Sequence, residues 1–322
     1  MERRNFIRSG LTLGLGATTF GSVFANNFLT ESAVSTPFFK LSLAQWSLHR
    51  AIREKKLNPY DFVAKAKELG FEGVEYVNQL YKDVSDAKNK PTALKQFASK
   101  LNAQAQQHSV QNVLIMIDGE GDLAVPSASE RNRAIENHKA WVETAAAMGC
   151  HSIRINLFGE RNEAAWKDQS AESMRKLGEF AATYNINIIV ENHGYLSSNA
   201  ALVMEMLNEV NLPNCGTLPD FGNFCLEREQ GKRWDAKCVR EYDRYQGVKE
   251  LLPKAFAVSA KSHDFDQAGN EIHTDFLRML KMVKAAGYTG FIGVEYEGQK
   301  IDEISGILAT KNLLLSQAKQ LT

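Results

Sequence analysis

Four residues of types that bind metals and transfer protons each follow a short apolar run. They are Glu191, Asp220, His263 and Glu295. If three carboxylates meet at one place, they repel one another unless a cation neutralises them. Two or three carboxylates with one imidazole suit one divalent ion, and Mn²⁺, Mg²⁺, Co²⁺ and Zn²⁺ are all candidates. The alternative is that each acid is simply ion-paired with a Lys or Arg nearby.

Such a site requires elements that bring distant residues together, and the chain shows the pattern of repeated βα units. From Phe38 onward, short apolar runs alternate with amphipathic stretches, several of which end on Gly as helices commonly do. We expect strands at Lys40–Gln45, Gly73–Tyr76, Asn112–Ile117, Ser152–Asn156, Asn187–Glu191, Gly216–Pro219, Ala255–Ser259 and Phe291–Glu295. We expect a first helix that opens at Asn58-Pro59, then helices at Thr92–His108, Ser129–Met148, Glu163–Tyr184, Asn199–Asn208, Ala236–Leu252, Thr274–Ala286 and Ile301–Leu321.

Eight strands that alternate with eight helices predict a single-domain (β/α)8 TIM barrel over residues 38–322. An internal sequence similarity supports this count, because Gly70–Tyr76 resembles Gly290–Tyr296. A doubly wound open sheet would be expected to carry a Gly-rich turn after its first strand, and none follows Gln45. In a TIM barrel the carboxyl ends of the strands meet at one mouth, where the four candidate residues would lie.

The first 25 residues resemble a twin-arginine export signal. Arg3-Arg4 precedes an uncharged, glycine-containing stretch that ends near Ala25, a small residue suited to cleavage. We therefore expect a periplasmic protein with a linker at 26–37 and no integral membrane segment in the mature chain; an uncleaved amphipathic anchor is the alternative. Replacing both arginines with lysine should leave precursor in the cytoplasm. Normal export of that variant would contradict the prediction.

Net charge and cysteine spacing exclude several classes of partner. The full chain has a formal net charge of zero, and removal of Arg3, Arg4, Arg8 and Glu2 with the signal would leave −2. A near-neutral protein lacks the basic surface that nucleic acid requires. The four cysteines form no CxxC pair, which argues against a structural zinc site. Cys225 and Cys238 lie in one stretch and are able to pair, but we expect most of the cysteines to be unpaired.

Other polar residues at the predicted strand ends are candidates to bind a substrate. They are Trp46, His49, Glu75, His193, Asn223 and Lys261. Aromatic rings at the mouth suit a sugar, although they also serve in packing. A Lys at a strand end either pairs with a neighbouring carboxylate or donates to a substrate oxygen.

Motifs on the last four strands resemble the xylose-isomerase-like TIM-barrel superfamily of sugar isomerases and epimerases, which also contains endonuclease-IV-like proteins. The motifs are Val190-Glu191-Asn192-His193-Gly194, Pro219-Asp220-Phe221-Gly222-Asn223, Ala260-Lys261-Ser262-His263 and Gly293-Val294-Glu295-Tyr296. The resemblance covers Phe38 to the C-terminus. It implies one divalent metal held by Glu191, Asp220, His263 and Glu295, with Glu191 and Glu295 as the pair that transfers protons.

The seventh strand departs from the family pattern, which is a ligand His, any residue, then Lys-Asp. Aligned on Lys261, the ligand position falls on Ser259, and His263 lies four residues later. Either His263 binds the metal from a shifted register, or the metal site is altered; His193 is a reserve ligand. Because of this departure, a carbohydrate-binding barrel without catalysis stays an alternative.

The predicted residues suit proton transfer next to a carbonyl. A metal flanked by two carboxylates favours an isomerase or epimerase that acts on a sugar, keto-sugar or polyol through an enediolate. A lyase or dehydratase acting on a keto-sugar or glycoside would use the same arrangement. An endonuclease-IV-like phosphodiesterase would need more metal-binding histidines and a basic surface, whereas the chain has seven His and no net charge.

Overall fold

The computed structural model describes residues 36–321. The predicted signal peptide, and the predicted linker up to residue 35, lie outside the described residues. No helix among the residues described is long and apolar enough to span a membrane.

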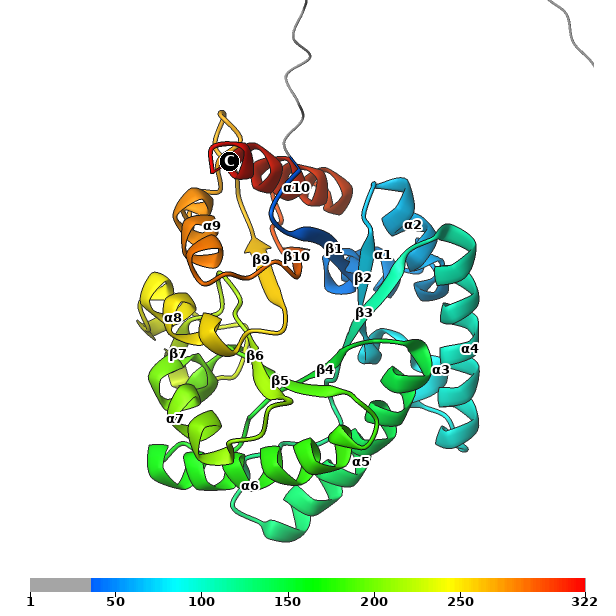
Figure 1. Cartoon of the computed structure of the whole chain (residues 1–322), viewed down its shortest axis with the longest axis vertical. Helices are drawn as coiled ribbons and strands as arrows, with labels where there is room; N and C mark the ends of the chain where they lie inside the picture. The colour runs from blue at the N-terminus through cyan, green and yellow to red at the C-terminus, as the bar shows by residue number, and fades with distance from the viewer. Residues whose placement is uncertain (1–35, 322) are drawn as a thin grey trace, which may run out of the picture. The chain divides into compact units, whose positions relative to one another are not determined.

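The predicted TIM barrel is confirmed. Eight parallel strands form one curled sheet in the order β6-β5-β4-β3-β2-β1-β10-β9, with the helices outside the ring of strands (Figure 1). Parallel bridges from Thr217 to Ala255 and from Asp220 to Ser259 connect the two edges of the sheet. The strands are β1 (Lys40–Ala44), β2 (Gly73–Val77), β3 (Gln111–Met116), β4 (Ser152–Ile155), β5 (Asn187–Glu191), β6 (Cys215–Leu218), β9 (Val258–Ser262) and β10 (Phe291–Tyr296).

The strands are almost wholly buried because the helices cover the outer face and side chains fill the inner one. The helices are α1 (His49–Arg53), α2 (Phe62–Glu68), α3 (Lys82–Ser85), α4 (Lys90–His108), α5 (Ala128–Met148), α6 (Glu163–Ala182), α7 (Ala200–Val210), α8 (Arg244–Leu251), α9 (Phe276–Ala285) and α10 (Glu303–Lys319). Asn162, Asn199 and Asp302 begin three of them by accepting a hydrogen bond from a backbone N–H in the first turn. Seven of the eight predicted helices lie where we expected them.

The predicted helix Ala236–Leu252 is wrong over its first half. Residues Cys238–Glu241 form β8, which pairs antiparallel with β7 (Cys225–Arg228). Asp243 is the N-cap residue of α8, so the helix begins at Arg244. Cys225 and Cys238 form a disulfide across this hairpin, a pairing that the sequence allowed but did not predict. Cys150 and Cys215 are free and buried, as expected.

The seventh barrel strand begins three residues later than predicted. We expected it at Ala255–Ser259, whereas β9 covers Val258–Ser262. Phe256 donates its N–H to the carbonyl of Thr217 before the regular strand begins, so the apolar run includes the chain's approach to the sheet. The shift places Ser259 and Lys261 inside the strand, two residues apart and therefore on one face.

Candidate functional site

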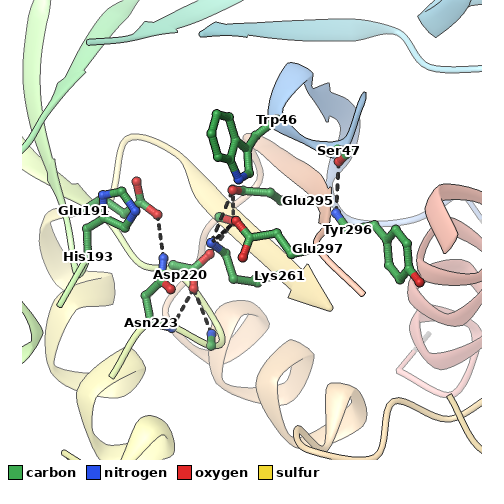
Figure 2. A network of polar contacts seen from close by, with 12 residues as sticks. Trp46, Ser47, Glu191, His193, Asp220, Asn223, Lys261, Glu295, Tyr296 and Glu297 are labelled. Carbon is green, nitrogen blue, oxygen red and sulfur yellow. Dashed lines mark hydrogen bonds and ion pairs between the residues drawn. The ribbon is translucent and has the colours of Figure 1, made fainter. Parts of the chain in front are cut away.

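Three carboxylates meet at the mouth of the barrel. Glu191 ends β5, Asp220 follows β6 and Glu295 lies in β10, and one oxygen of each lies within 4.8 Å of the others. All three residues are buried, with at most 4% of their surface exposed. Figure 2 shows their carboxylates directed toward one region beside Lys261. The structure therefore brings together three of the four predicted ligands.

Ser259 occupies the place on the seventh strand from which the family's histidine would act. Its hydroxyl lies 2.6 Å from Asp220 Oδ2 and 3.1 Å from Glu295 Oε2, within hydrogen-bonding distance of both. Two backbone N–H groups, of Gly222 and Asn223, donate to Asp220 Oδ1 at 2.8 Å. These contacts hold the Asp220 carboxylate in one orientation.

Two buried cations also contact the acidic cluster. Arg154 Nε lies 2.9 Å from Glu191 Oε2, and Lys261 Nζ lies 3.2 Å from Glu295 Oε1. Lys261 also pairs with Glu297 at 3.1 Å, and Arg154 with Asp118 at 3.0 Å. Glu191, Asp220, Glu295, Glu297 and Asp118 are five carboxylates facing two cations, so the cations neutralise the acids only in part.

Burial and mutual repulsion leave the three central carboxyls easier to protonate than in water. Burial raises the pKa of Glu191 and Glu295, and raises that of Asp220 to about 7. Burial would raise the pKa of Glu297 too, but Lys261 beside it lowers that pKa to about 2. Lys261 itself is buried, yet the surrounding carboxylates hold its pKa well above its ordinary value. The site thus combines a charged ammonium with carboxyls that bind protons more readily than they would in water.

The three carboxylates form a donor set that fits a hard divalent cation. Each carboxylate oxygen has two lone pairs and can bind a metal as well as accept a hydrogen bond. Glu191 Oε2 accepts no hydrogen bond, although Arg154 lies beside it. Glu191, Asp220 and Glu295 are the residues that would hold such an ion.

The structure does not bring His263 into this cluster. β9 ends at Ser262, so the strand alternation that would direct His263 inward stops one residue before it. The imidazole lies 6.2 Å from the ring of His273, centroid to centroid, and the backbone N–H of His263 donates to Glu271. The reserve ligand His193 is likewise outside the three-carboxylate group.

Five of the six predicted substrate-binding residues line one cavity of about 720 Å³, which Glu295 of the cluster also lines. They are Trp46, His49, His193, Asn223 and Lys261. Asn223 Nδ2 also donates to Glu191 Oε1 at 3.0 Å. The sixth, Glu75, is fully buried in the barrel, where it accepts from Ser42 at 2.5 Å and where burial raises its pKa to about 8. Glu75 therefore lies outside the cavity lining.

His193 is held neutral with a defined orientation. Burial, with Arg154 and Lys261 nearby, lowers its pKa to about 3. Its Nδ1 lies 2.7 Å from Asn156 Oδ1, and Asn156 donates in turn to Asp118 Oδ1. Because an amide oxygen only accepts, Nδ1 of His193 is the donor and Nε2 carries the lone pair. The imidazole can accept a hydrogen bond from a substrate hydroxyl.

Sequence reasoning missed two parts of the site. Arg154 lies in β4 and Asp118 follows β3, and both were visible as polar residues at predicted strand ends. The contacts of Arg154 with Glu191 and Asp118 could not be predicted from spacing. The hairpin segment that brings Arg228 and Trp234 into the cavity lining precedes the predicted helix Ala236–Leu252, and that helix was wrongly predicted to cover β8. The one sequence signal of the hairpin was the pair Cys225 and Cys238.

Comparison with known proteins agrees with this architecture. Residues 63–316 match the family described as Xylose isomerase-like TIM barrel. The structure of 3-keto-D-glucoside 4-epimerase from E. coli superposes with a TM-score of 0.61 at 13% identity, covering 80% of this chain and 94% of that one. A xylose isomerase-like TIM-barrel protein from Mycobacterium smegmatis was solved in complex with magnesium. It superposes with a TM-score of 0.62 at 13% identity, covering 89% of this chain and 99% of that one.

A short segment of the chain is similar to a known protein. It is 33% identical over 55 residues to the C-glycoside deglycosidase alpha subunit of Arthrobacter globiformis. The matched segment covers 17% of this chain and only 16% of that relative. The match to the family model, in contrast, covers most of the barrel, and the resemblance expected from the strand motifs is confirmed. The chain belongs to the xylose isomerase-like TIM-barrel family.

Proposed function

We propose that the protein is an isomerase or epimerase that acts on a sugar, keto-sugar or related polyol. The observation that carries the proposal is the pair of buried glutamates, Glu191 and Glu295, in one carboxylate cluster at the mouth of a barrel of this family. Because burial raises the pKa of each above that of a glutamate in water, each binds a proton more readily than an exposed glutamate does. The epimerase named above has the same fold and supports the assignment.

Each residue of the site has a role in the proposed reaction. One glutamate removes the proton from the carbon next to the carbonyl, which yields an enediolate, and the other returns a proton to a carbon of the same intermediate. The ammonium of Lys261 lies within 3.2 Å of Glu295 and stabilises its ionised form. His193 accepts a hydrogen bond from a sugar hydroxyl through Nε2. A divalent ion in the cluster would polarise the carbonyl oxygen of the sugar.

We further propose that the ion is Mg²⁺ or Mn²⁺ rather than Zn²⁺ or Co²⁺. Glu191, Asp220 and Glu295 supply oxygen donors alone, and Ser259 takes the place that a histidine has in the family pattern. Oxygen ligands suit hard cations, whereas imidazole suits zinc. The magnesium in the M. smegmatis structure is consistent with this choice.

Addition of Mg²⁺ or Mn²⁺ to chelator-treated protein is expected to raise its Tm. The ion relieves repulsion among three buried carboxylates and binds only the folded chain, which stabilises it by about 2.7 kcal/mol at a concentration 100 times Kd. Asp220→Asn should shift the midpoint of this rise to a higher metal concentration, while Glu136→Gln, on the exposed face of α5, should behave as wild type. Unchanged Tm and unchanged activity after chelation would contradict the metal proposal.

A lyase is the second candidate function, favoured by the short match to a glycoside deglycosidase. Elimination also begins with removal of a proton next to a carbonyl, so Glu191 and Glu295 would serve it equally. The two functions differ in their products, because an isomerase conserves the mass of its substrate.

A panel of aldoses, ketoses and keto-glycosides, incubated with Mg²⁺- or Mn²⁺-treated protein, separates these functions. We expect a product with the mass of the substrate and a different chromatographic retention. Loss of water or of an aglycone in place of such an isomer would instead establish the lyase. The Glu191→Gln variant serves as the control for turnover by contaminating enzymes.

A further inference from the structure

The disulfide-bonded hairpin carries a tryptophan to the rim of the cavity. Residues 229–237 connect β7 to β8, and Trp234 within them lines the cavity together with Phe158 and His193. Trp141 and Trp166 are 1% exposed and belong to the core, whereas Trp234 is 40% exposed. An aromatic ring that remains this open at the rim of a cavity has a face available to a ligand.

The segment is held in place by contacts with two neighbouring loops and by its own disulfide. Arg233 binds the Asp122 carboxylate through both terminal nitrogens, at 2.8 and 3.3 Å. Arg161 donates to the carbonyl of Gly231 at 2.8 Å, and the Cys225–Cys238 disulfide closes the base of the hairpin. The position of Trp234 is therefore defined before any ligand binds, which lowers the entropic cost of stacking on it.

Trp234 contributes to an aromatic wall on one side of the mouth. Its ring lies 4.9 Å from that of His193 and 5.8 Å from that of Phe158, between centroids. These partners follow β5 and β4, whereas the stacked pair Trp46 and His49 follows β1. In the strand order, β1 and β5 are four places apart in both directions around the ring, so the two aromatic groups lie on opposite sides of the mouth.

The cavity is larger than one sugar ring requires. About 720 Å³ lies in the range of sites that enclose drug-sized ligands. The polar groups that would act on a sugar, Lys261 and Glu295, come from β9 and β10 and line the same cavity as Trp234. A substrate with one reacting ring over the carboxylates has room for a second ring against the hairpin.

We propose that Trp234, fixed by the disulfide-bonded hairpin, forms a second subsite that stacks on a ring attached to the reacting sugar. The preferred substrate is then a glycoside or oligosaccharide rather than a free monosaccharide. The proposal rests on the proposed function for the identity of the first ring, and it assigns the specificity for the second ring to Trp234.

Binding of matched glycosides tests the subsite without turnover. The probes are methyl and phenyl β-glycosides of D-glucose, D-galactose and D-mannose, measured by calorimetry with Mg²⁺-treated protein. These probes have no free carbonyl, so the proposed isomerase reaction does not consume them, and a failure of the isomerase assignment would not affect the measurement. In at least one pair, wild-type protein should bind the phenyl glycoside about tenfold more tightly than the methyl glycoside, the size expected of one stacked ring pair.

Two substitutions at Trp234 and one matched control distinguish stacking from a structural role. Trp234→Ala should abolish the preference for phenyl and leave the Kd of the methyl glycoside unchanged, while Trp234→Phe should retain most of the preference. Tyr184→Ala removes an equally exposed ring that precedes β5, at the opposite end of the barrel, and should change neither Kd. The proposal is overturned by an absent preference in wild-type protein, by lack of binding in all pairs, or by a Trp234→Ala variant that keeps the preference or weakens both probes equally.

Discussion

Glu295→Gln is expected to lower kcat by about two to four orders of magnitude while the protein keeps its fold. Glutamine has the shape of glutamate and retains one coordinating oxygen, but it cannot accept or return the proton, and general acid–base catalysis is worth about 10²–10⁴-fold. Glu191→Gln should have an effect of the same size because the two residues divide the proton transfers. Steady-state kinetics on the substrate found with the sugar panel provide the measurement.

Two comparisons make this result specific to proton transfer. Asp220→Asn should act mainly on metal affinity, so excess Mg²⁺ or Mn²⁺ should recover part of its activity but none of that lost in Glu295→Gln. Glu136→Gln alters an exposed glutamate on α5, outside the cluster, and should leave kcat at the wild-type value. Wild-type kcat in either Glu191→Gln or Glu295→Gln would remove that residue from the reaction.

Arg154→Met is expected to lower the free energy of unfolding by about 3–5 kcal/mol, because removal of one member of a buried ion pair leaves the other charge uncompensated. Arg154 is 4% exposed and contacts both Asp118 and Glu191. Methionine fills a similar volume without a charge. The loss of unfolding free energy would therefore report the lost electrostatic interactions and not the creation of a cavity. Urea denaturation of the metal-free protein gives the value.

A surface pair and a double variant control for other causes of this loss. Lys176→Met breaks an exposed pair with Glu172 on α6 and should cost no more than about 1 kcal/mol. Adding Glu191→Gln to Arg154→Met should restore part of the stability, since it removes one of the unpaired carboxylates. A double variant no more stable than Arg154→Met would show that the Arg154–Glu191 contact contributes little.

Most of the barrel could be predicted because its strands are short apolar runs bounded by polar residues. β5 lies at the predicted Asn187–Glu191, since its burial on both faces produces an unbroken apolar run. β9 was predicted three residues too early because Ala255–Ala257 are equally apolar, although they form only an isolated bridge, from Ala255 to Thr217, before the regular strand begins. The hairpin was missed because β8 has mostly exposed residues, so its sequence carries no alternation, and its disulfide pairing is a tertiary contact.

The acidic cluster could be predicted because parallel strands all deliver their carboxyl ends to one mouth. Correct prediction of where β5, β6 and β10 end was enough to predict that Glu191, Asp220 and Glu295 lie close together. The position of His263 depends on where β9 ends, which is at Ser262. Residue spacing alone does not determine where a strand ends, so this position could not be predicted. The partners of Arg154 and Lys261 depend on neighbouring strands in the closed ring, which no local pattern specifies.

Deuterium incorporation tests the central claim most directly. The sugar that turns over in the panel is incubated in D₂O with Mg²⁺- or Mn²⁺-treated protein, and the recovered substrate and product are examined by NMR. We expect deuterium on the carbon next to the carbonyl with wild-type protein, and none above background with Glu191→Gln or Glu295→Gln. Isomerisation without deuterium in either compound, or full incorporation by both variants, would contradict proton transfer by these two glutamates.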